Sequence, residues 1–250
     1  MLLIRSLIFN VVLFGLMLVM GILCMPLAIW SAKGASWSIR TYCRIILRLL
    51  ALICGLKTEI RGEVPTGEVI VCSKHQSFLD IIMLSATLPR VKFIMKKELR
   101  WTPVLGFYAM RMGSTPVHRG KKAQAMNDMV AHASKSREAE PSQLVIYPEG
   151  TRVAPGVKRP YKVGAGVLYE RFGNPCVPAA TNAGVFWGRN EVYRRPGLAV
   201  LEFLPVIPAG LPIKTFMRQL EKTVEEHSDA LMREAGFEPP ALTETPPETR

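Results

Sequence analysis

The feature that most constrains this chain is a long uncharged run near its N-terminus. Residues 6–30 contain no Asp, Glu, Lys or Arg, and about 20 apolar residues are enough to cross the hydrocarbon of a bilayer. A cleaved signal peptide is the main alternative, because Arg5 precedes the run as a basic n-region would. The run is longer than a usual signal-peptide core, so we expect it to be retained as a membrane anchor. Asn10 and Pro26 interrupt it and leave open whether it spans the bilayer or enters one leaflet.

A second apolar segment follows at residues 37–57, with Arg40, Arg44 and Arg48 at four-residue steps. This spacing places the three arginines on one face of a helix. A basic face opposite an apolar face is typical of a helix that lies in the headgroup layer. The alternative is an ordinary core helix. Residues 1–60 are therefore predicted to form membrane-associated helices.

The charge of the chain favours an anionic partner. The formal net charge is +12, and residues 63–220 alone carry 22 Lys or Arg against 11 Asp or Glu. Nucleic acid, an anionic leaflet and a phosphorylated substrate all suit such an excess, and the apolar N-terminal run favours lipid. Since most cations follow that run, the positive-inside tendency predicts a body on the cytoplasmic face of a membrane, which in a bacterium is the inner membrane.

The cysteines indicate neither a disulfide framework nor a zinc site. They stand singly among apolar residues, without a CxxC pair or a His-rich cluster. Such residues are typical of reduced thiols in a core or a membrane segment. We therefore expect no metal. The residues concerned are Cys24, Cys43, Cys54, Cys72 and Cys176.

From residue 61 onward, short apolar runs alternate with helical patterns. Strands are predicted at 68–73, 91–96, 175–182 and 199–207, and at 143–150 a strand that enters a Pro/Gly turn. Helices are predicted at 78–88, 122–136, 163–173 and 213–237, and a helix or a loop at 102–113. This alternation predicts one α/β domain over residues 61–237, with a mixed, largely parallel sheet covered by helices on both faces. Residues 238–250 are rich in Pro, Glu and Thr, and we expect them to form a disordered tail.

The segment VCSKHQSFLD, residues 71–80, places His75 five positions before Asp80. On a regular helix such residues point about 140° apart. If His75 lies in the turn before the helix and Asp80 in its first turn, the carboxylate can accept one imidazole N–H and leave the other nitrogen as a base. The alternative is structural, because Ser77 and Asp80 also fit a capping box. The nucleophile motif GxSxG is absent, so the hydroxyl that His75 would activate is expected to belong to a substrate.

The segment YPEGTR, residues 147–152, predicts an anion site. It continues an apolar run into a Pro/Gly turn, after which Thr151 and Arg152 offer hydroxyl and guanidinium donors. Arginine can give a phosphate two charge-assisted hydrogen bonds. The alternative is a solvated turn in which Arg152 pairs with Glu149. Other cations stand near segment ends and would form a basic pocket if they converged at one edge of the sheet: Lys96, Lys97, Arg119 and Lys162.

Four motifs together resemble the HxxxxD family of glycerolipid acyltransferases. HQSFLD resembles its HxxxxD block, YPEGTR its FPEGTR block, GSTPVHRG the block that ends in a basic residue, and CVPAATN the closing V-P block. They occur in the family's order and approximate spacing over residues 62–210. The combination is far more specific than any one motif. Within the family, the chain is most similar to the bacterial 1-acylglycerol-3-phosphate acyltransferase type.

This resemblance implies transfer of a fatty acyl group from a thioester to the free hydroxyl of 1-acylglycerol-3-phosphate, giving phosphatidic acid. The co-substrate would be a thioester of acyl carrier protein or coenzyme A, and no further cofactor is implied. The expected partners are thus the lysophospholipid, the thioester donor and an anionic membrane, with no nucleic acid. His75 would be the general base and Asp80 its orienting partner. The phosphate would be held by Lys96, Arg119, Glu149, Gly150, Thr151 and Arg152.

Two departures from the family pattern bear on the acceptor. Lys74 stands where many members have Asn, and STPVH replaces a more hydrophobic stretch ahead of Arg119. Beside the base, Lys74 would repel a protonated imidazole or bind an acidic head group. An acceptor without phosphate, such as lyso-ornithine lipid, is therefore an alternative, with Arg152 holding a carboxylate. A non-catalytic protein that binds anionic lipid and a thioesterase are the remaining alternatives.

Overall fold

The molecule is built on a mixed, largely parallel sheet, as predicted. The structure, a computed structural model, describes residues 1–117, 127, 129–134 and 141–239. Within these residues the sheet has seven strands in the order β1-β7-β6-β2-β5-β3-β4. Strands β6 and β7 run antiparallel, and the other neighbouring pairs are parallel. The strands are β1 (Leu56–Arg61), β2 (Val69–Ser73), β3 (Val91–Lys96), β4 (Thr115–Val117), β5 (Gln143–Ile146), β6 (Cys176–Thr181) and β7 (Gly197–Phe203).

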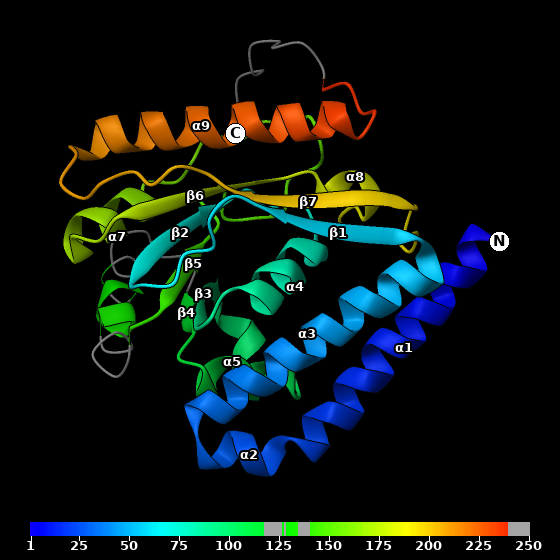
Figure 1. Cartoon of the computed structure of the whole chain (residues 1–250). Helices are drawn as coiled ribbons and strands as arrows, with labels where there is room; N and C mark the ends of the chain where they lie inside the picture. Colours follow the sequence, from blue (N-terminus) through cyan, green and yellow to red (C-terminus); the bar gives the residue numbers. More distant parts are fainter. Residues whose placement is uncertain (118–126, 128, 135–140, 240–250) are drawn as a thin grey trace.

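Helices cover both faces of this sheet (Figure 1). One face carries α9, which packs on β6 and on α7, and the other carries α3, α4 and α5 with α1 outside them. The helices are α1 (Leu2–Leu23), α2 (Met25–Trp30), α3 (Ala32–Cys54), α4 (Phe78–Thr87), α5 (Leu105–Arg111), α7 (Gly164–Phe172), α8 (Ala183–Phe186) and α9 (Ile213–Glu234), with a 3-10 helix, η1, at Lys97–Trp101.

The two faces bury separate apolar clusters. The side of α1, α3 and α4 buries Ile46, Leu50 and Leu79 among others, whereas the side of α7 and α9 buries Leu168 and Phe216. The central strand β2 contributes alternate residues to the two clusters, because successive side chains of a strand point to opposite faces. A strand buried on both faces reads as a continuous apolar run, which explains the sequence VIVC.

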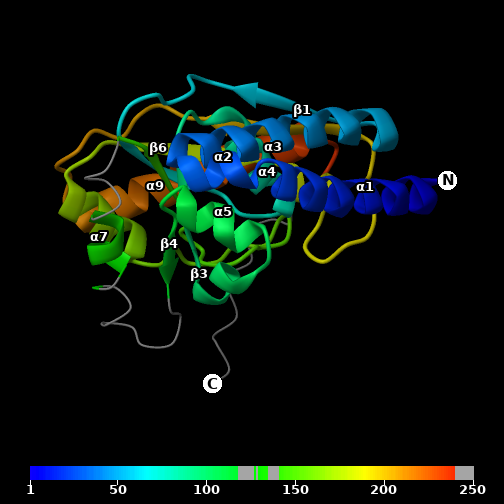
Figure 2. The same cartoon turned by 90° about the horizontal axis from the view of Figure 1, so that it is seen from below.

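Helix α1 lies lengthwise against the body of the protein, and Figure 2 shows it beside α3. The hydroxyl of Tyr42 donates to the carbonyl of Leu13, and the hydroxyl of Tyr108 donates to that of Gly21, both at 2.9 Å. The helix is long and apolar enough to cross a membrane. Its other face, together with α2, exposes large apolar side chains: Ile4, Val11, Phe14, Leu18, Ile22, Leu27 and Trp30. This exposed apolar surface agrees with the predicted anchor.

Two of the three arginines of the second apolar segment also contact helix α4, while Arg44 and Arg48 remain exposed. Arg40 donates to the carbonyl of Leu88, and the Nε of Arg44 donates to the carbonyl of Ala86 at 3.1 Å. Both carbonyls lie at the C-terminal end of α4, where the helix dipole favours cations. The apolar face of α3 packs on α1 and α4. Helix α3 therefore packs its apolar face as a core helix would and exposes two of its arginines, so its position in the headgroup layer stays a prediction.

The sequence patterns missed the two outer strands. Helix α3 ends at Cys54 because Gly55 takes a left-handed conformation (φ 69°), and β1 begins at the next residue. The predicted domain boundary at residue 60 thus falls inside a strand of the sheet. Strand β4, at the opposite edge, has three residues. The predicted helix at 122–136 and the tail at 238–250 fall mostly on residues 118–126, 128, 135–140 and 240–250, which lie outside the described part.

Candidate active site

His75 lies in the turn between the central strand β2 and helix α4. Its Nδ1 is 3.0 Å from Oδ1 of Asp80, and the residue is 9% exposed. The turn lets the chain fold back, because Ser73 ends the strand and the helix begins only at Phe78. The structure therefore brings together the two residues that the sequence predicted as a pair.

The carboxylate of Asp80 both orients the imidazole and caps the helix. Its Oδ2 accepts from the backbone N–H groups of Gln76 (2.9 Å) and Ser77 (2.8 Å). The hydroxyl of Ser77 accepts in return from the N–H of Leu79 at 3.0 Å. This is the capping box that the sequence suggested as the structural alternative. The two interpretations are compatible, because Asp80 uses one oxygen for the ring and the other for the cap.

This geometry fixes which ring nitrogen can act as a base. An ionised carboxylate only accepts hydrogen bonds, so the neutral ring carries its proton on Nδ1 and leaves the lone pair on Nε2. Among the described residues Nε2 has no hydrogen-bond partner. Asp80 is fully buried, at 0% exposure, and it lies in the first turn of α4, where the helix dipole favours an anion. The arrangement can accept a proton on Nε2 and stabilise the resulting imidazolium.

Tyr147 holds the imidazole from its face. The two rings are stacked with centroids 3.8 Å apart and an interplanar angle of 16°. Burial raises the pKa of Tyr147 well above its usual value, and nearby Asp80 adds to the effect. The phenol therefore stays neutral, and its hydroxyl lies 3.5 Å from Oδ1 of Asp80. The sequence pattern identified this tyrosine as part of a motif but gave no indication that it stacks on the base.

The turn that follows β5 also holds the backbone of His75. Oε2 of Glu149 accepts from the N–H of His75 at 3.2 Å, and the N–H of Val153 donates to the carbonyl of His75 at 2.8 Å. Strands β2 and β5 are parallel neighbours, so their C-terminal ends meet at one edge of the sheet. Ligands bind in the crevice at this edge in open α/β sheets. The two motifs that the sequence predicted to cooperate are thus joined by direct contacts.

The structure places the carboxylate of Glu149 in the interior against Lys74, and its predicted role in phosphate binding stays a prediction. Its side chain is fully buried (0%), with Oε1 2.8 Å from Nζ of Lys74. Burial raises the pKa of Glu149, and the ammonium of Lys74 partly opposes this effect. An ionised carboxylate would repel a phosphate. In the structure the side chain of Glu149 supports the turn through its contacts with Lys74 and the backbone of His75.

Lys74 also differs from its predicted roles. Its side chain is 2% exposed, and it contacts Glu149 and Glu225 of helix α9. A lysine held in this way cannot reach an acidic head group at the surface. Its charge is compensated by two carboxylates, so it does not act as an uncompensated cation beside the base. The sequence gave no signal for Glu225, which lies 151 residues away from Lys74.

The other groups predicted to donate hydrogen bonds to a phosphate lie around the same edge of the sheet. Gly150 has a left-handed φ of 69°, and a Cβ at this position would lie 2.8 Å from Nζ of Lys162. The ammonium group of Lys162 is therefore next to the turn that carries Thr151 and Arg152. Both of these residues are partly exposed and available to a ligand.

Lys96 ends β3, next to β5 in the sheet. Its side chain is 48% exposed, and Nζ lies 3.7 Å from Oε2 of Glu98. In the pairing of β3 with β4, Lys96 faces Val117. Arg119, the other predicted phosphate ligand, lies outside the described residues.

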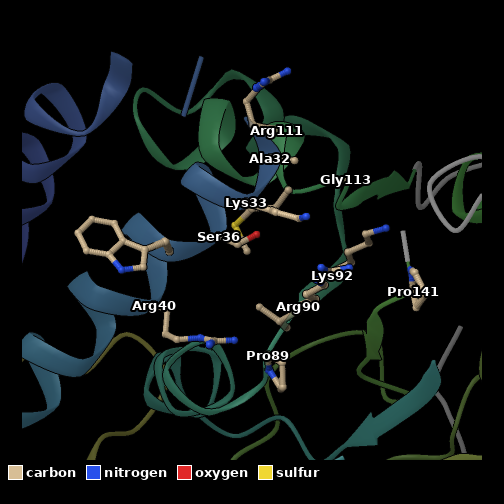
Figure 3. Close-up of a pocket in the computed structure, with 13 residues that line it drawn as sticks. Ala32, Lys33, Ser36, Arg40, Pro89, Arg90, Lys92, Arg111, Gly113 and Pro141 are labelled. Atoms are coloured by element: carbon tan, nitrogen blue, oxygen red, sulfur yellow. The ribbon is translucent and has the colours of Figure 1, made fainter. Parts of the chain in front are cut away.

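A cavity of about 240 Å³ lies away from this site, between the start of α3, the start of β3 and the end of α5 (Figure 3). Neither His75 nor Asp80 lines it. Two of its cations have structural roles, because Arg40 donates to the end of α4 and Arg111 donates to the carbonyls of Ala28 and Ile29.

Among the described residues, no group of three or more His, Cys, Asp or Glu side chains could hold a metal ion.

Comparison with known proteins relates the chain to one family. Residues 56–182 match the Acyltransferase family, a range that contains both His75 and the 147–152 turn. The 1-acyl-sn-glycerol-3-phosphate acyltransferase of Pseudomonas aeruginosa is 25% identical over 173 residues, covering 68% of this chain and 67% of the relative. The enzyme of the same name from Helicobacter pylori is 36% identical over 122 residues, covering 48% of this chain and 51% of the relative.

A solved structure shares the fold over almost the whole chain. The crystal structure of 1-acyl-sn-glycerophosphate acyltransferase from Thermotoga maritima matches with a TM-score of 0.76. The match covers 92% of this chain and 95% of that one, at 17% sequence identity. The comparison therefore extends beyond the catalytic domain to the N-terminal helices.

Proposed function

The chain belongs to the Acyltransferase family, and we propose that it transfers a fatty acyl group from a thioester to the free hydroxyl of 1-acylglycerol-3-phosphate. The observation that carries the proposal is the contact of 3.0 Å between Nδ1 of His75 and Oδ1 of Asp80. This pair lies beside a turn whose groups can donate hydrogen bonds to a phosphate. The names of the relatives support the choice of acceptor. Phosphatidic acid would be the product.

The proposed reaction begins when Nε2 of His75 removes the proton of the acceptor hydroxyl. The oxygen attacks the thioester carbonyl carbon, and a new C–O bond forms while the carbonyl oxygen takes up negative charge. The C–S bond then breaks, and the imidazolium returns the proton to the leaving thiolate. The carboxylate of Asp80 stabilises the imidazolium during this step, in which general base catalysis typically contributes about 10²–10⁴-fold.

The phosphate of the acceptor would be held by Arg152 and Thr151, with Lys96 and Arg119 as the other proposed ligands and the backbone of Gly150 close to it. Arg152 lies on the turn whose Glu149 and Val153 contact the backbone of His75. A phosphate bound there would place the rest of the acceptor at a fixed distance from Nε2. Such positioning of two reactants supplies a large part of an enzyme's acceleration.

We also propose that the protein is embedded in one leaflet and does not span the bilayer. Helix α1 is attached to the body of the protein near both of its ends, at Ser6 and at Gly21. A helix that crossed the bilayer would have to leave these contacts. The exposed apolar side chains of α1 and α2 would face the acyl chains, so a lysolipid can enter the site from the membrane. We place the body on the cytoplasmic face, where acyl carrier protein or coenzyme A thioesters are available.

An acceptor comparison tests this function. Purified protein in mixed micelles is given an acyl thioester of either acyl carrier protein or coenzyme A. Separate reactions contain 1-acylglycerol-3-phosphate, lyso-ornithine lipid or no lipid acceptor, so that water is the only acceptor in the last. We expect acylated product chiefly with the first acceptor. Faster acylation of the phosphate-free lipid would overturn the choice of acceptor, and free fatty acid without acylated product would indicate a thioesterase. Binding to anionic vesicles without any turnover would indicate a non-catalytic lipid-binding protein.

Arg152→Gln tests the phosphate contact in the same assay. Because a charge-assisted hydrogen bond is lost, we expect KM for 1-acylglycerol-3-phosphate to rise by roughly tenfold. Arg171→Gln, on helix α7, is the matched control and should leave KM unchanged. An unchanged KM in both variants would contradict the role of Arg152.

A further inference from the structure

A buried ion cluster joins the active-site turns to the C-terminal helix. Nζ of Lys74 lies 2.8 Å from Oε1 of Glu149, and 2.6 Å and 2.9 Å from the two carboxylate oxygens of Glu225. Three separate elements meet here: the turn after β2, the turn after β5 and helix α9. The three residues are 1%, 2% and 7% exposed, so the cluster is shielded from water.

The members of the cluster stabilise one another. Burial alone would lower the pKa of Lys74, but the carboxylates of Glu149 and Glu225 outweigh burial and raise the pKa, so the ammonium stays charged. Tyr161 donates its hydroxyl to Oε1 of Glu225 at 2.9 Å. Removing one partner of a buried ion pair leaves an uncompensated charge, which is strongly unfavourable. The position of each member therefore depends on the other two.

The cluster is directly connected to the catalytic base. Glu149 uses one oxygen for Lys74 and the other for the backbone N–H of His75. Lys74 is also the residue that precedes His75 in the chain. The base is thus held by the cluster through its own N–H and through its neighbour.

We infer that Lys74 and Glu225 are positioning residues of the acyl transfer. They hold Glu149, and through it the backbone of His75, at a fixed place relative to the turn that carries Arg152. This inference rests on the proposed function, since the distance that it fixes is the one between Nε2 of His75 and the turn proposed to bind the phosphate of the acceptor.

The net charge of the cluster differs between variants, so the inference predicts a different kcat for each of them. With all members ionised, the cluster carries one positive and two negative charges, a net charge of −1. Lys74→Met leaves two buried carboxylates without a cation, whereas Glu225→Gln leaves the neutral pair of Lys74 and Glu149. The double variant retains a single carboxylate. Adding Glu225→Gln should therefore restore part of the kcat that Lys74→Met loses, although Glu225→Gln alone should not raise kcat above that of the wild type.

Two measurements test the inference on the folded, full-length variants. The first is kcat and KM for 1-acylglycerol-3-phosphate. We expect Lys74→Met to lower kcat by about 10–100-fold, with KM changed less than about threefold, because a small displacement of a catalytic group lowers the rate of the chemical step. We expect Glu225→Gln to lower kcat by no more than about threefold, because the amide oxygen of Gln can still accept a hydrogen bond from Lys74. The double variant should have a kcat at least about threefold above that of Lys74→Met.

The second measurement is the NMR signal of the His75 ring, assigned by its loss in His75→Gln. Stacking on Tyr147 should shift the ring protons upfield in the wild type, and Lys74→Met should remove this shift. The signal does not depend on turnover. If the wild-type protein fails to acylate any acceptor, the proposed function fails, while the ring signal still shows whether the cluster positions His75.

Lys158→Met is the matched control. Lys158 also joins the segment after β5 to helix α9, with Nζ 3.0 Å from Oδ2 of Asp229, but its side chain is 38% exposed. The Asp229 side chain is 12% exposed, and among the described residues neither member of this pair has a hydrogen bond or ion pair with Glu149 or His75, so kcat and the ring signal should remain those of the wild type. Equal loss of kcat in Lys158→Met and Lys74→Met would show a general effect of detaching α9, and would overturn the specific role of the cluster.

If Lys74→Met does not fold, kcat and the ring signal of Glu225→Ala test the inference instead. This variant removes the contact with α9 but retains the neutral pair of Lys74 and Glu149, so it should fold, with kcat lowered by about 3–10-fold and the ring signal displaced. A wild-type kcat together with an unchanged ring signal, in either Glu225→Ala or a folded Lys74→Met, would overturn the inference. A double variant that is no better than Lys74→Met would do so as well.

Discussion

At the scale of single residues, the site depends on one carboxylate that makes two kinds of contact. Asp80 accepts from the imidazole of His75 with one oxygen and from the backbone N–H groups of Gln76 and Ser77 with the other. The contacts that begin helix α4 therefore also orient the base. Loss of the carboxylate should affect catalysis and stability together, and the two effects can be separated by choosing the substitution.

Asp80→Asn should lower turnover by about 10²–10⁴-fold, because an amide can donate to Nδ1 and so favour the wrong tautomer of His75. Ser77→Ala removes the cap hydroxyl and leaves the carboxylate, so it should lower the free energy of unfolding by about 1 kcal/mol and reduce turnover far less. Turnover assays and thermal unfolding of both variants check this. Equal turnover in the two would show that Asp80 is only a helix cap.

Tyr147 offers a second test at this scale. Tyr147→Phe keeps the stacked ring and loses only a hydroxyl at 3.5 Å from Oδ1 of Asp80, a distance at the limit of a hydrogen bond. We expect turnover within about threefold of the wild type, whereas Tyr147→Ala should lower it by at least about tenfold, since the imidazole loses its packing partner. Similar turnover in the Phe and Ala variants would contradict a role for stacking.

At the scale of elements, the polar residues of α1 show how this apolar helix is attached to the body. Oδ1 of Asn10 accepts from the guanidinium of Arg194 at 2.7 Å, and the hydroxyl of Ser6 accepts from the backbone N–H of Arg194 at 2.9 Å. The same guanidinium lies over the ring of Trp187, 3.8 Å from its centroid. Burial lowers the pKa of Arg194 to about 10, so it remains charged at neutral pH and needs these acceptors.

Asn10→Leu should therefore destabilise the protein, although it makes α1 more apolar. Arg194 is 4% exposed, and a buried charged donor without its acceptor costs about 1–3 kcal/mol. Thermal unfolding in detergent micelles measures the loss. Val11→Leu, on the exposed face of the same helix, is the control and should change stability by less than about 0.5 kcal/mol. A stabilised Asn10→Leu protein would show that α1 is held chiefly by apolar contacts.

At the scale of the whole molecule, the sequence predicted the centre of the sheet better than its edges. Strands β2, β3, β5, β6 and β7 contain apolar runs because they are buried, and the strand β1 is not recognisable because its sequence LKTEIR lies at an edge and is only partly buried. The pair His75–Asp80 was predictable because both residues lie within one local turn. The partnership of Lys74 with Glu225 was not, since it depends on packing between elements 151 residues apart.

The alkaline stability of the folded protein should reflect three buried groups. The pKa of Lys74 is raised because its carboxylate partners outweigh burial, and burial raises the pKa of both Tyr147 and Tyr161 above their usual values near 10. The folded state then keeps protons that the unfolded chain releases, so the free energy of unfolding should fall as pH rises above about 10.

Tyr161→Phe removes one of these protons and should make the fall less steep, which chemical unfolding at several alkaline pH values can measure. Tyr193→Phe is the control, because the Tyr193 side chain is exposed and should leave the slope unchanged. A slope that is the same in the wild type and in Tyr161→Phe would contradict the contribution of the buried phenol.

Turnover of folded His75→Ala with 1-acylglycerol-3-phosphate and an acyl thioester shows whether Nε2 of His75 takes the proton of the lipid hydroxyl. We expect a kcat at least about 100-fold below that of the wild type, with an unchanged unfolding transition and retained binding of the acceptor. Wild-type turnover by the folded variant would contradict this role of His75.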